Sequence, residues 1–137
     1  MNSEKLVYID DYAHHPEELK AFIAAVRELY PEKKILGVFQ PHLFSRTLHF
    51  ADEFASVLDT LDEVILLEIY PAREEPILGV SSRMLLEKMK LVDKMVLQKN
   101  EILKNLENRG IEVLLTMGAG DIDQLVDPIE KLLINRL

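Results

Sequence analysis

Five short apolar runs recur along the chain, and stripes of apolar residues at helical spacing separate them. Short runs rich in β-branched residues are typical of buried strands, whereas apolar residues three and four positions apart form one face of a helix. The predicted strands are Lys5–Ile9, Lys34–Phe39, Val64–Ile69, Lys94–Leu97 and Val113–Met117. Repeated alternation of strand and helix requires mostly parallel strands joined by right-handed crossovers, so the pattern predicts a layered α/β sheet.

Boundary residues indicate where the helices begin and end. Pro16, followed by two glutamates, suits a first helical turn, and Tyr30-Pro31 ends that helix. A second helix is expected to carry one continuous apolar face with Phe50, Phe54, Val57, Leu58 and Leu61. The remaining signals are Ser81 and Asn100 as N-caps, Gly110 as a C′ glycine, and Asp127 as the N-cap of a last helix that starts at Pro128.

Four polar loops follow the predicted strands. They are residues 10–15, 40–46, 70–75 and 118–121. The carboxyl ends of parallel strands meet at one edge of a sheet, so these loops are expected to form one rim, where open α/β sheets bind their ligands. The fold class predicted is a Rossmann-like, three-layer α/β domain with a mostly parallel sheet of five or six strands. Residues 1–137 are expected to form this single domain.

Composition narrows the classes of function. The chain has 137 residues, of which 48% are apolar and 29% charged, the balance of one globular domain. With a formal net charge of −8 and no basic run, nucleic-acid binding is not expected. No apolar run approaches the roughly 20 residues that span a bilayer. The absence of cysteine excludes disulfides and thiolate metal sites and fits an intracellular setting.

The first rim loop concentrates titratable groups, with Asp10, Asp11, His14 and His15 close together. Clustered acids and imidazoles perturb each other's titration, as functional sites often require. An ordinary solvated turn before a helix-starting proline explains the same residues. A metal site that adds His42 is imaginable, but adjacent histidines do not easily reach one ion, so no metal ligands are assigned.

Two further rim elements could bind an anion. The Gly118-Ala119-Gly120-Asp121 turn leaves backbone N–H groups bare at a helix start, although two glycines also serve a plain tight turn. Arg46 could clamp a carboxylate or phosphate in bidentate fashion, or could be a surface arginine paired with a neighbouring acid. The chain contains no GxxxxGK[ST] phosphate loop and no nucleophile-elbow sequence.

Four motifs in this order and spacing resemble the C-terminal domain of the Mur ligases, the amino-acid ligases of peptidoglycan synthesis. The motifs are DDYAHHP at 10–16, FQPHLFSRT at 39–47, YPAREEPI at 70–77 and GAGDI at 118–122. The first motif is general to the family, whereas the first two together resemble the branch that joins L-alanine to UDP-N-acetylmuramate. The resemblance covers nearly the whole chain.

The resemblance implies a cytoplasmic enzyme of three domains. An N-terminal domain would bind the UDP sugar, and a central domain would carry the phosphate loop and hold most of the Mg²⁺. ATP would phosphorylate the muramyl carboxylate, and the amine of L-alanine would attack the acyl phosphate. This domain would close over both other domains, help to hold the amino acid and the nucleotide, and be inactive alone.

The resemblance also implies roles for individual residues. Asp11 resembles the acid that binds the nucleotide ribose, and Arg46 resembles the arginine that grips the amino-acid carboxylate. Tyr12, His14 and His42 resemble residues that line the closed active site near the reacting groups. There are two departures from the family pattern: Leu43 occupies a position that is often basic, and Leu78 a position where proline is expected.

Three other functions fit the sequence. The ligase that reattaches recycled tripeptide to the same UDP sugar has similar C-terminal motifs. A freestanding module that binds a small anion or a nucleotide would need the same rim without any chemistry. A metal-dependent hydrolase would use the cluster of aspartates and histidines.

Overall fold

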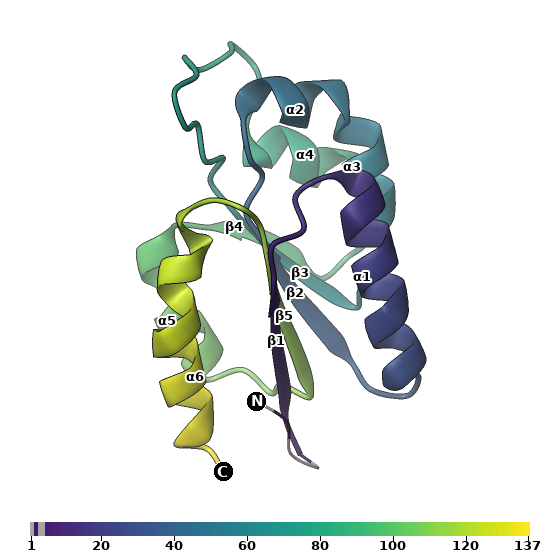
Figure 1. Cartoon of the computed structure of the whole chain (residues 1–137), viewed down its shortest axis with the longest axis vertical. Coiled ribbons are helices and arrows are strands. Elements are labelled where there is room, and N and C mark those ends of the chain that lie inside the picture. Colours follow the sequence, from purple (N-terminus) through teal and green to yellow (C-terminus); the bar gives the residue numbers. More distant parts are fainter. Residues whose placement is uncertain (1, 3–4) are drawn as a thin grey trace.

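The computed structural model describes residue 2 and residues 5–137, so most of the expected irregular lead-in at Met1–Glu4 lies outside the described residues. Its strands form one five-stranded sheet in the order β1-β5-β2-β3-β4, and every neighbouring pair is parallel (Figure 1). The strands are β1 Val7–Asp11, β2 Ile35–Phe39, β3 Glu63–Leu67, β4 Lys94–Leu97 and β5 Val113–Met117. The predicted α/β class with a parallel sheet is confirmed.

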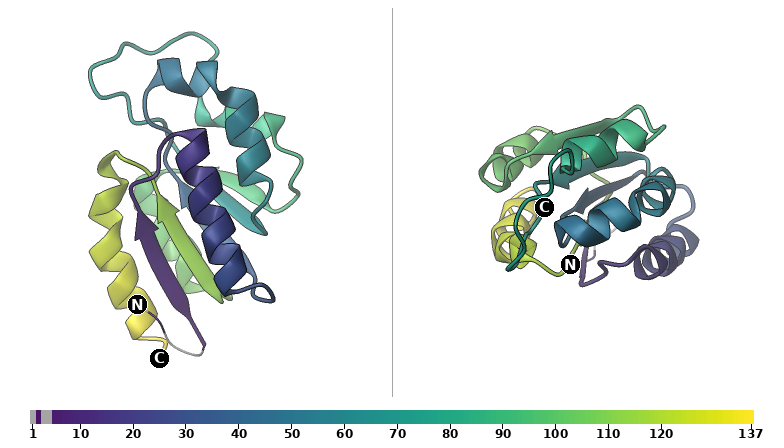
Figure 2. Two further views of the ribbon diagram at one scale, coloured as in Figure 1. Left: turned by 45° about the vertical axis from the view of Figure 1, so that its right-hand side comes forward. Right: turned by 90° about the horizontal axis from the view of Figure 1, so that it is seen from above.

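Helices cover both faces of the sheet, which gives three layers (Figure 2). The helices are α1 Pro16–Leu29, α2 Phe44–His49, α3 Ala51–Leu58, α4 Ser82–Lys88, α5 Ile102–Glu107 and α6 Val126–Ile134, with 3₁₀ turns η1 Lys99–Glu101 and η2 Asp121–Leu125. Helices α1, α3 and α4 pack on one face through Leu19, Phe54 and Leu85. Helices α5 and α6 pack on the other through Ile102 and Ile129. Every residue of β2, β3 and β5 is buried, as expected of parallel strands covered on both sides.

Three predicted strands have different bounds in the structure, and the second, predicted as Lys34–Phe39, is Ile35–Phe39. The first strand was predicted as Lys5–Ile9 but is Val7–Asp11, which moves Asp10 and Asp11 from the loop into the strand. The third strand was predicted as Val64–Ile69 but is Glu63–Leu67. In the first and third strands polar residues keep the ladder hydrogen bonds of a parallel pair, which an apolar count does not detect.

The helix predicted around Phe50 is in fact two helices. Phe50 leaves helical geometry at φ −110° and ψ 23°, ends α2 and begins α3. Its ring packs against His49, with centroids 4.5 Å apart, and against Phe54, with centroids 6.5 Å apart. The break therefore turns the chain while keeping the apolar face on the core.

Helix α1 begins at Pro16 and ends before Tyr30-Pro31 as predicted, and of the four other boundary signals one was right and three were wrong. Ser81 Oγ accepts the Met84 N–H as predicted. Asn100 is not an N-cap, because the 3₁₀ turn before α5 begins after Gln98, whose N–H donates to Glu101 Oε1 at 2.7 Å. Helix α5 ends at Glu107, and Gly110 has no positive φ, so it is not a left-handed C′ residue. Helix α6 begins at Val126, which places Asp127 inside the first turn.

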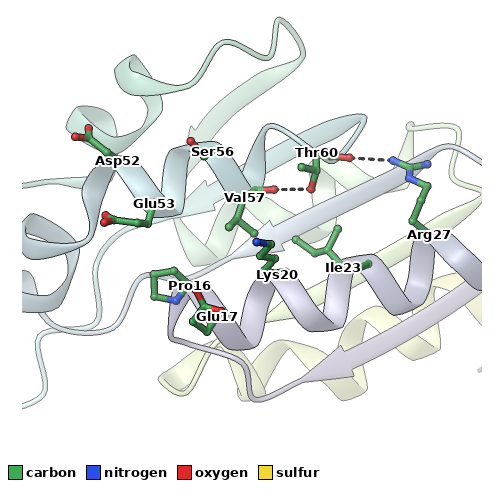
Figure 3. Close-up of a pocket in the computed structure, with 11 residues that line it drawn as sticks. Pro16, Glu17, Lys20, Ile23, Arg27, Asp52, Glu53, Ser56, Val57 and Thr60 are labelled. Atoms are coloured by element: carbon green, nitrogen blue, oxygen red, sulfur yellow. Dashed lines mark hydrogen bonds between the residues drawn. The ribbon is translucent and has the colours of Figure 1, made fainter.

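A groove of about 580 Å³ runs between α1 and α3 (Figure 3). Ile23 and Val57 line it with apolar surface, and charged side chains such as Lys20 and Glu53 surround it. None of the five predicted site residues contributes to its walls. This groove is thus separate from the rim.

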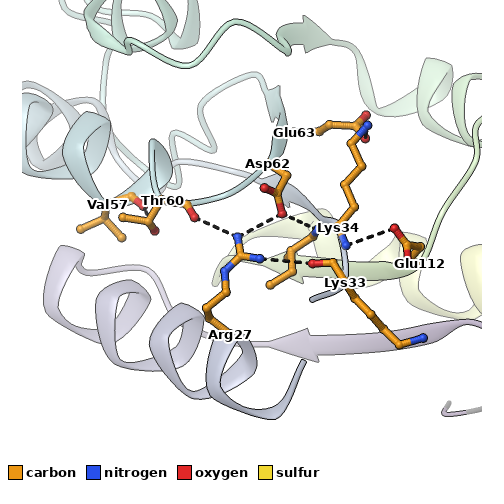
Figure 4. A network of polar contacts seen from close by, with 9 residues as sticks. Arg27, Lys33, Lys34, Val57, Thr60, Asp62, Glu63 and Glu112 are labelled. Atoms are coloured by element: carbon orange, nitrogen blue, oxygen red, sulfur yellow. Dashed lines mark hydrogen bonds and ion pairs between the residues drawn. The ribbon is translucent and has the colours of Figure 1, made fainter. Parts of the chain in front are cut away.

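The edge of the sheet opposite the rim is held by polar contacts of Arg27 (Figure 4). Its Nη2 donates to Thr60 O at 3.1 Å and to Asp62 Oδ2 at 3.0 Å, and its Nη1 donates to Lys33 O at 3.2 Å. Asp62 Oδ2 also accepts the Ile35 N–H at 2.8 Å. These contacts join the end of α1 to the turns before β2 and β3, so this edge has a structural role.

Candidate functional site

The strand order brings the four polar loops together at one edge of the sheet. We call residues 10–15, 40–46, 70–75 and 118–121 the rim. Strand β5 lies between β1 and β2, and it leads to α6 on one face, whereas β1 and β2 lead to helices on the other. Adjacent strands whose connections diverge leave a crevice at their carboxyl ends, where α/β proteins bind ligands. The predicted gathering of loops is confirmed by contacts among them.

The first loop is shaped by hydrogen bonds from its own side chains. Asp11 Oδ2 accepts the Ala13 N–H at 2.9 Å, and its Oδ1 accepts no hydrogen bond from the described residues. Glu18 Oε1 accepts the N–H groups of His14 and His15, at 3.2 and 3.0 Å, which lowers the pKa of Glu18. Tyr12 leaves its side chain 70% exposed between these anchored positions. Asp11 and Tyr12 therefore present a carboxylate oxygen and a ring to the rim.

Asp10 does not join Asp11 at this site. Consecutive strand residues point to opposite faces, and Asp10 Oδ1 accepts a hydrogen bond from Thr116 Oγ1 at 2.6 Å. Thr116 Oγ1 in turn lies 2.8 Å from the Tyr8 hydroxyl, and burial raises the pKa of Tyr8. The imagined Asp–His metal cluster does not converge, and no group of three potential ligands is found within residues 2 and 5–137. This geometry gives no support to a metal-dependent hydrolase.

Four aromatic rings connect three rim loops. Ring centroids are 5.3 Å apart for Tyr12 and His14, 5.7 Å for His14 and His42, and 5.4 Å for His42 and Tyr70. Centroid distances of this size are typical of packed aromatic pairs. His42 Nδ1 is buried and has no hydrogen-bond partner among the described residues. The loops after β1, β2 and β3 thus meet at His42.

Arg46 lies in the first turns of α2, beside His42. Its Nη1 atom is buried and has no hydrogen-bond partner in the described part of the chain. It forms no ion pair with any described acid, so it is not the paired surface arginine considered from the sequence. An unsatisfied buried donor costs roughly 1–3 kcal/mol, more when it is charged. An anionic acceptor bound at this position would remove that cost.

The glycine turn after β5 is a tight turn filled by Gln40. Gln40 Oε1 accepts the Ile122 N–H at 2.9 Å, and its Nε2 donates to Asp121 Oδ1 at 2.7 Å. A Cβ on Gly120 would lie 2.6 Å from Gln40 Oε1 and 2.7 Å from Tyr70 Cβ, so only glycine fits there. The structure supports the tight-turn interpretation rather than an open anion cradle.

Three contributors to the rim were not singled out from the sequence. Gln40 is only 6% exposed and joins the loops after β2 and β5. Lys99 Nζ bonds Asp121 Oδ2 at 2.7 Å, and Glu74 accepts hydrogen bonds from Ser45. Their partners lie 22 to 82 positions away in the sequence. A polar residue directly after a buried strand was the available signal for Gln40.

The neutral form of His42 is favoured at this site. Burial lowers its pKa below the ordinary 6.5, and the positive charge of Arg46 and the His14 ring lower it further, while Glu74 opposes the shift. A folded-state pKa below the unfolded value means that the stabilisation by neutral His42 is present above about pH 6.5. It is lost as the pH falls through the folded-state pKa.

We therefore expect the His42 ring to titrate below pH 6.5 in an NMR titration of the chain. Replacing Arg46 by glutamine removes one of the opposing positive charges and should move the midpoint upward. A His42 midpoint at or above 6.5, unchanged by Arg46→Gln, would contradict this electrostatic account.

The fold and rim define an α/β domain with a ligand crevice at the carboxyl edge of its sheet. The family of Mur ligase glutamate ligase domains matches residues 1–122, and this chain belongs to that family. The family resemblance inferred from the motifs is thereby confirmed.

Three comparisons describe the relationship. Over 133 residues the chain is 52% identical to UDP-N-acetylmuramate–L-alanine ligase of Flavobacterium johnsoniae, covering 97% of this chain and 30% of that protein. The structure of UDP-N-acetylmuramate–alanine ligase from Thermotoga maritima matches 93% of this chain and 27% of that one, with 26% identity and a TM-score of 0.70. A murein peptide ligase from Psychrobacter arcticus, 15% identical, matches 97% of this chain and 28% of that one with a TM-score of 0.73, which shows the shared fold alone. The chain thus spans about 30% of the length of its curated relatives.

Proposed function

We propose that this chain is the C-terminal lobe of an ATP-dependent ligase that joins L-alanine to UDP-N-acetylmuramate in peptidoglycan synthesis. The observation that carries the proposal is a pair of buried nitrogens, Arg46 Nη1 and His42 Nδ1, that have no partner among the described residues at the rim of a Mur ligase domain. Both lie where a ligand would supply the missing acceptors or donors. The 52% identity to an alanine-adding relative supports L-alanine as the amino acid.

Arg46 binds the α-carboxylate of L-alanine in this proposal. A guanidinium offers parallel N–H donors that match a carboxylate in bidentate geometry. His42, kept neutral by burial and by Arg46, can bond the amine end of the same substrate. Tyr12 and His14 extend the wall of this site through their ring contacts with His42.

The reaction needs two group transfers. The γ-phosphoryl group of ATP passes to an oxygen of the muramyl carboxylate, and ADP leaves. The alanine nitrogen then attacks the acyl carbon, an amide C–N bond forms, phosphate leaves, and the amine loses a proton. This chain contributes orientation of the attacking amine, which can provide several kcal/mol of rate acceleration.

Asp11 is proposed to bind the ATP ribose. Its Oδ1 is free of described partners, and the next residue, Tyr12, is exposed, which fits a nucleoside at the rim. The sequence has no phosphate loop, and the described residues offer no set of ligands for Mg²⁺. The phosphates and most of the Mg²⁺ coordination are therefore assigned to a central ATPase domain, and the UDP sugar to an N-terminal domain.

The setting proposed is the cytoplasm, where the nucleotide substrates are found, with residues 1–137 as a single domain and no nucleic acid or membrane as partner. Within the described residues, no helix is long and apolar enough to cross a bilayer. A tripeptide-recycling ligase is the second candidate, because a murein peptide ligase has the same fold. A freestanding binding module remains the alternative from another class.

Comparing the chain with the full-length ligase tests the proposal. The chain alone should release no ADP with ATP, UDP-N-acetylmuramate and L-alanine, because it lacks the phosphate loop. The full-length protein should release ADP only when all three substrates are present. Robust substrate-dependent ADP release by residues 1–137 alone would refute the proposed division of labour.

A further inference from the structure

Helix α2, which carries Arg46, is capped from outside its own segment. Its N-cap residue, Leu43, has no polar side chain and a φ of +72°, and no side chain of its own segment caps the first turn. The cap comes from Glu74, in the loop between β3 and α4. Glu74 Oε1 accepts the Ser45 N–H at 3.1 Å, and Glu74 Oε2 accepts the Ser45 hydroxyl.

The segment that supplies Glu74 is joined to the loop before α2 by backbone hydrogen bonds. The Tyr70 N–H donates to Pro41 O, and the Leu43 N–H donates to Tyr70 O, both at 2.8 Å. Leu43 O accepts the Thr47 hydroxyl at 2.8 Å. A non-glycine residue at positive φ is strained and persists only where its surroundings hold it. The conformation of the loop before α2 therefore depends on the segment after β3.

Glu74 itself is presented by a turn. Its N–H donates to Pro71 O at 2.9 Å, and Ala72 in this turn has a φ of +54°. The neighbouring Glu75 is exposed, and its carboxylate forms no hydrogen bond or ion pair with the described residues. The two adjacent glutamates thus have different surroundings, which provides a matched pair for mutation.

The Glu74 carboxylate caps α2 but forms no ion pair with Arg46 among the described residues. Hydrogen bonds from Ser45 are the main reason that the pKa of Glu74 lies below its usual value, and the nearby Arg46 charge adds to this. No ion pair between Arg46 and Glu74 is found among the described residues, and Arg46 Nη1 has no hydrogen-bond partner among them. Both carboxylate oxygens of Glu74 accept hydrogen bonds from Ser45, which lies in the first turn of α2, one residue before Arg46.

We propose that Glu74 is a positioning residue for the amino-acid substrate. By capping α2 from the loop after β3, it holds Arg46 with its guanidinium unpaired and directed to the rim. This inference rests on the proposed function, in which Arg46 binds the substrate carboxylate. It adds a residue that touches no substrate and acts through Arg46.

Steady-state kinetics of the full-length ligase test the proposal, with alanine and ATP varied separately. Glu74→Ala should raise the alanine KM about tenfold, the effect of a modest loss of orientation, and leave the ATP KM within about twofold. Glu74→Gln keeps an acceptor for Ser45 and should stay within about threefold of wild type for alanine. The control Glu75→Ala should match wild type.

A double mutant separates positioning from a general structural role. If Glu74 acts through Arg46, adding Glu74→Ala to Arg46→Ala should cause no further loss in alanine use. Independent, additive losses, or an equal rise in the ATP KM, would overturn the proposal. Should Glu74→Ala fail to fold, Ser45→Ala removes one hydrogen bond of the same cap and should shift the alanine KM in the same direction.

The positioning role of Glu74 and the substrate-binding role of Arg46 are tested separately by the two single mutants. Wild-type alanine use by Glu74→Ala, when Arg46→Ala is severely impaired, would overturn only the positioning role. Wild-type alanine use by Arg46→Ala would overturn the assignment of Arg46 and the positioning role with it.

Discussion

Replacing Arg46 by alanine in the full-length ligase is expected to lower kcat/KM for L-alanine by roughly two to three orders of magnitude. This corresponds to about 3–4 kcal/mol, the scale of losing an oriented, charge-assisted pair in a closed site. The reason is that Arg46 Nη1 is buried at the rim and has no hydrogen-bond partner in the described part of the chain. Kinetics with each substrate varied separately provide the measurement.

Arg46→Lys distinguishes charge from geometry. Lysine restores the charge but not the planar fork, so alanine use should be weakened less than in Arg46→Ala but remain below wild type. ATP and UDP-sugar KM values should change little in both variants, because neither substrate needs this contact. A near wild-type alanine KM and kcat for Arg46→Ala would show that Arg46 does not bind the substrate.

Replacing Asp11 by alanine should mainly raise the KM for ATP. A ribose contact is made in the ground state and the transition state alike, so its loss removes uniform binding. The expected cost is about 1.5–3 kcal/mol, that of a hydrogen bond to a charged group. Asp11→Ala also removes the acceptor of the Ala13 N–H, whereas Asp11→Asn keeps an acceptor there and tests the charge alone.

Asp10→Ala is the matched control for this prediction. Asp10 is adjacent in sequence but bonds Thr116 on the other face of the sheet, so the ATP KM should stay near wild type. A large fall in kcat with an unchanged ATP KM in Asp11→Ala would show that Asp11 acts in the chemical step instead.

Apolar patterning located all five strands of the sheet. Lys94–Leu97 and Val113–Met117 were predicted with the bounds they have in the structure, because apolar runs there end at turn residues. Where β1 ends, polar Asp10 and Asp11 continue the ladder, so an apolar count placed the strand too early. The 3₁₀ turn before α5 is capped by Gln98 and Glu101 instead of Asn100, because β4 ends at Leu97 and the turn begins directly after Gln98.

The rim was predicted from topology, but its internal contacts were not. Parallel strands with helical crossovers require the loops after them to share an edge, whatever the side chains are. By contrast, the capping of α2 by Glu74 and the bridge from Gln40 to Asp121 join residues 29 and 81 positions apart. Asp10 and Asp11 point to opposite faces because both lie in β1. The prediction ended this strand at Ile9 and so placed both residues in one loop.

The most direct test of the proposed function compares amine donors in the full-length ligase. ADP release is measured with ATP and UDP-N-acetylmuramate while either L-alanine or the recycled tripeptide is supplied. The account predicts release that depends on L-alanine and is abolished or severely reduced by Arg46→Ala. Release with the tripeptide but not with L-alanine, or no release with either, would contradict it.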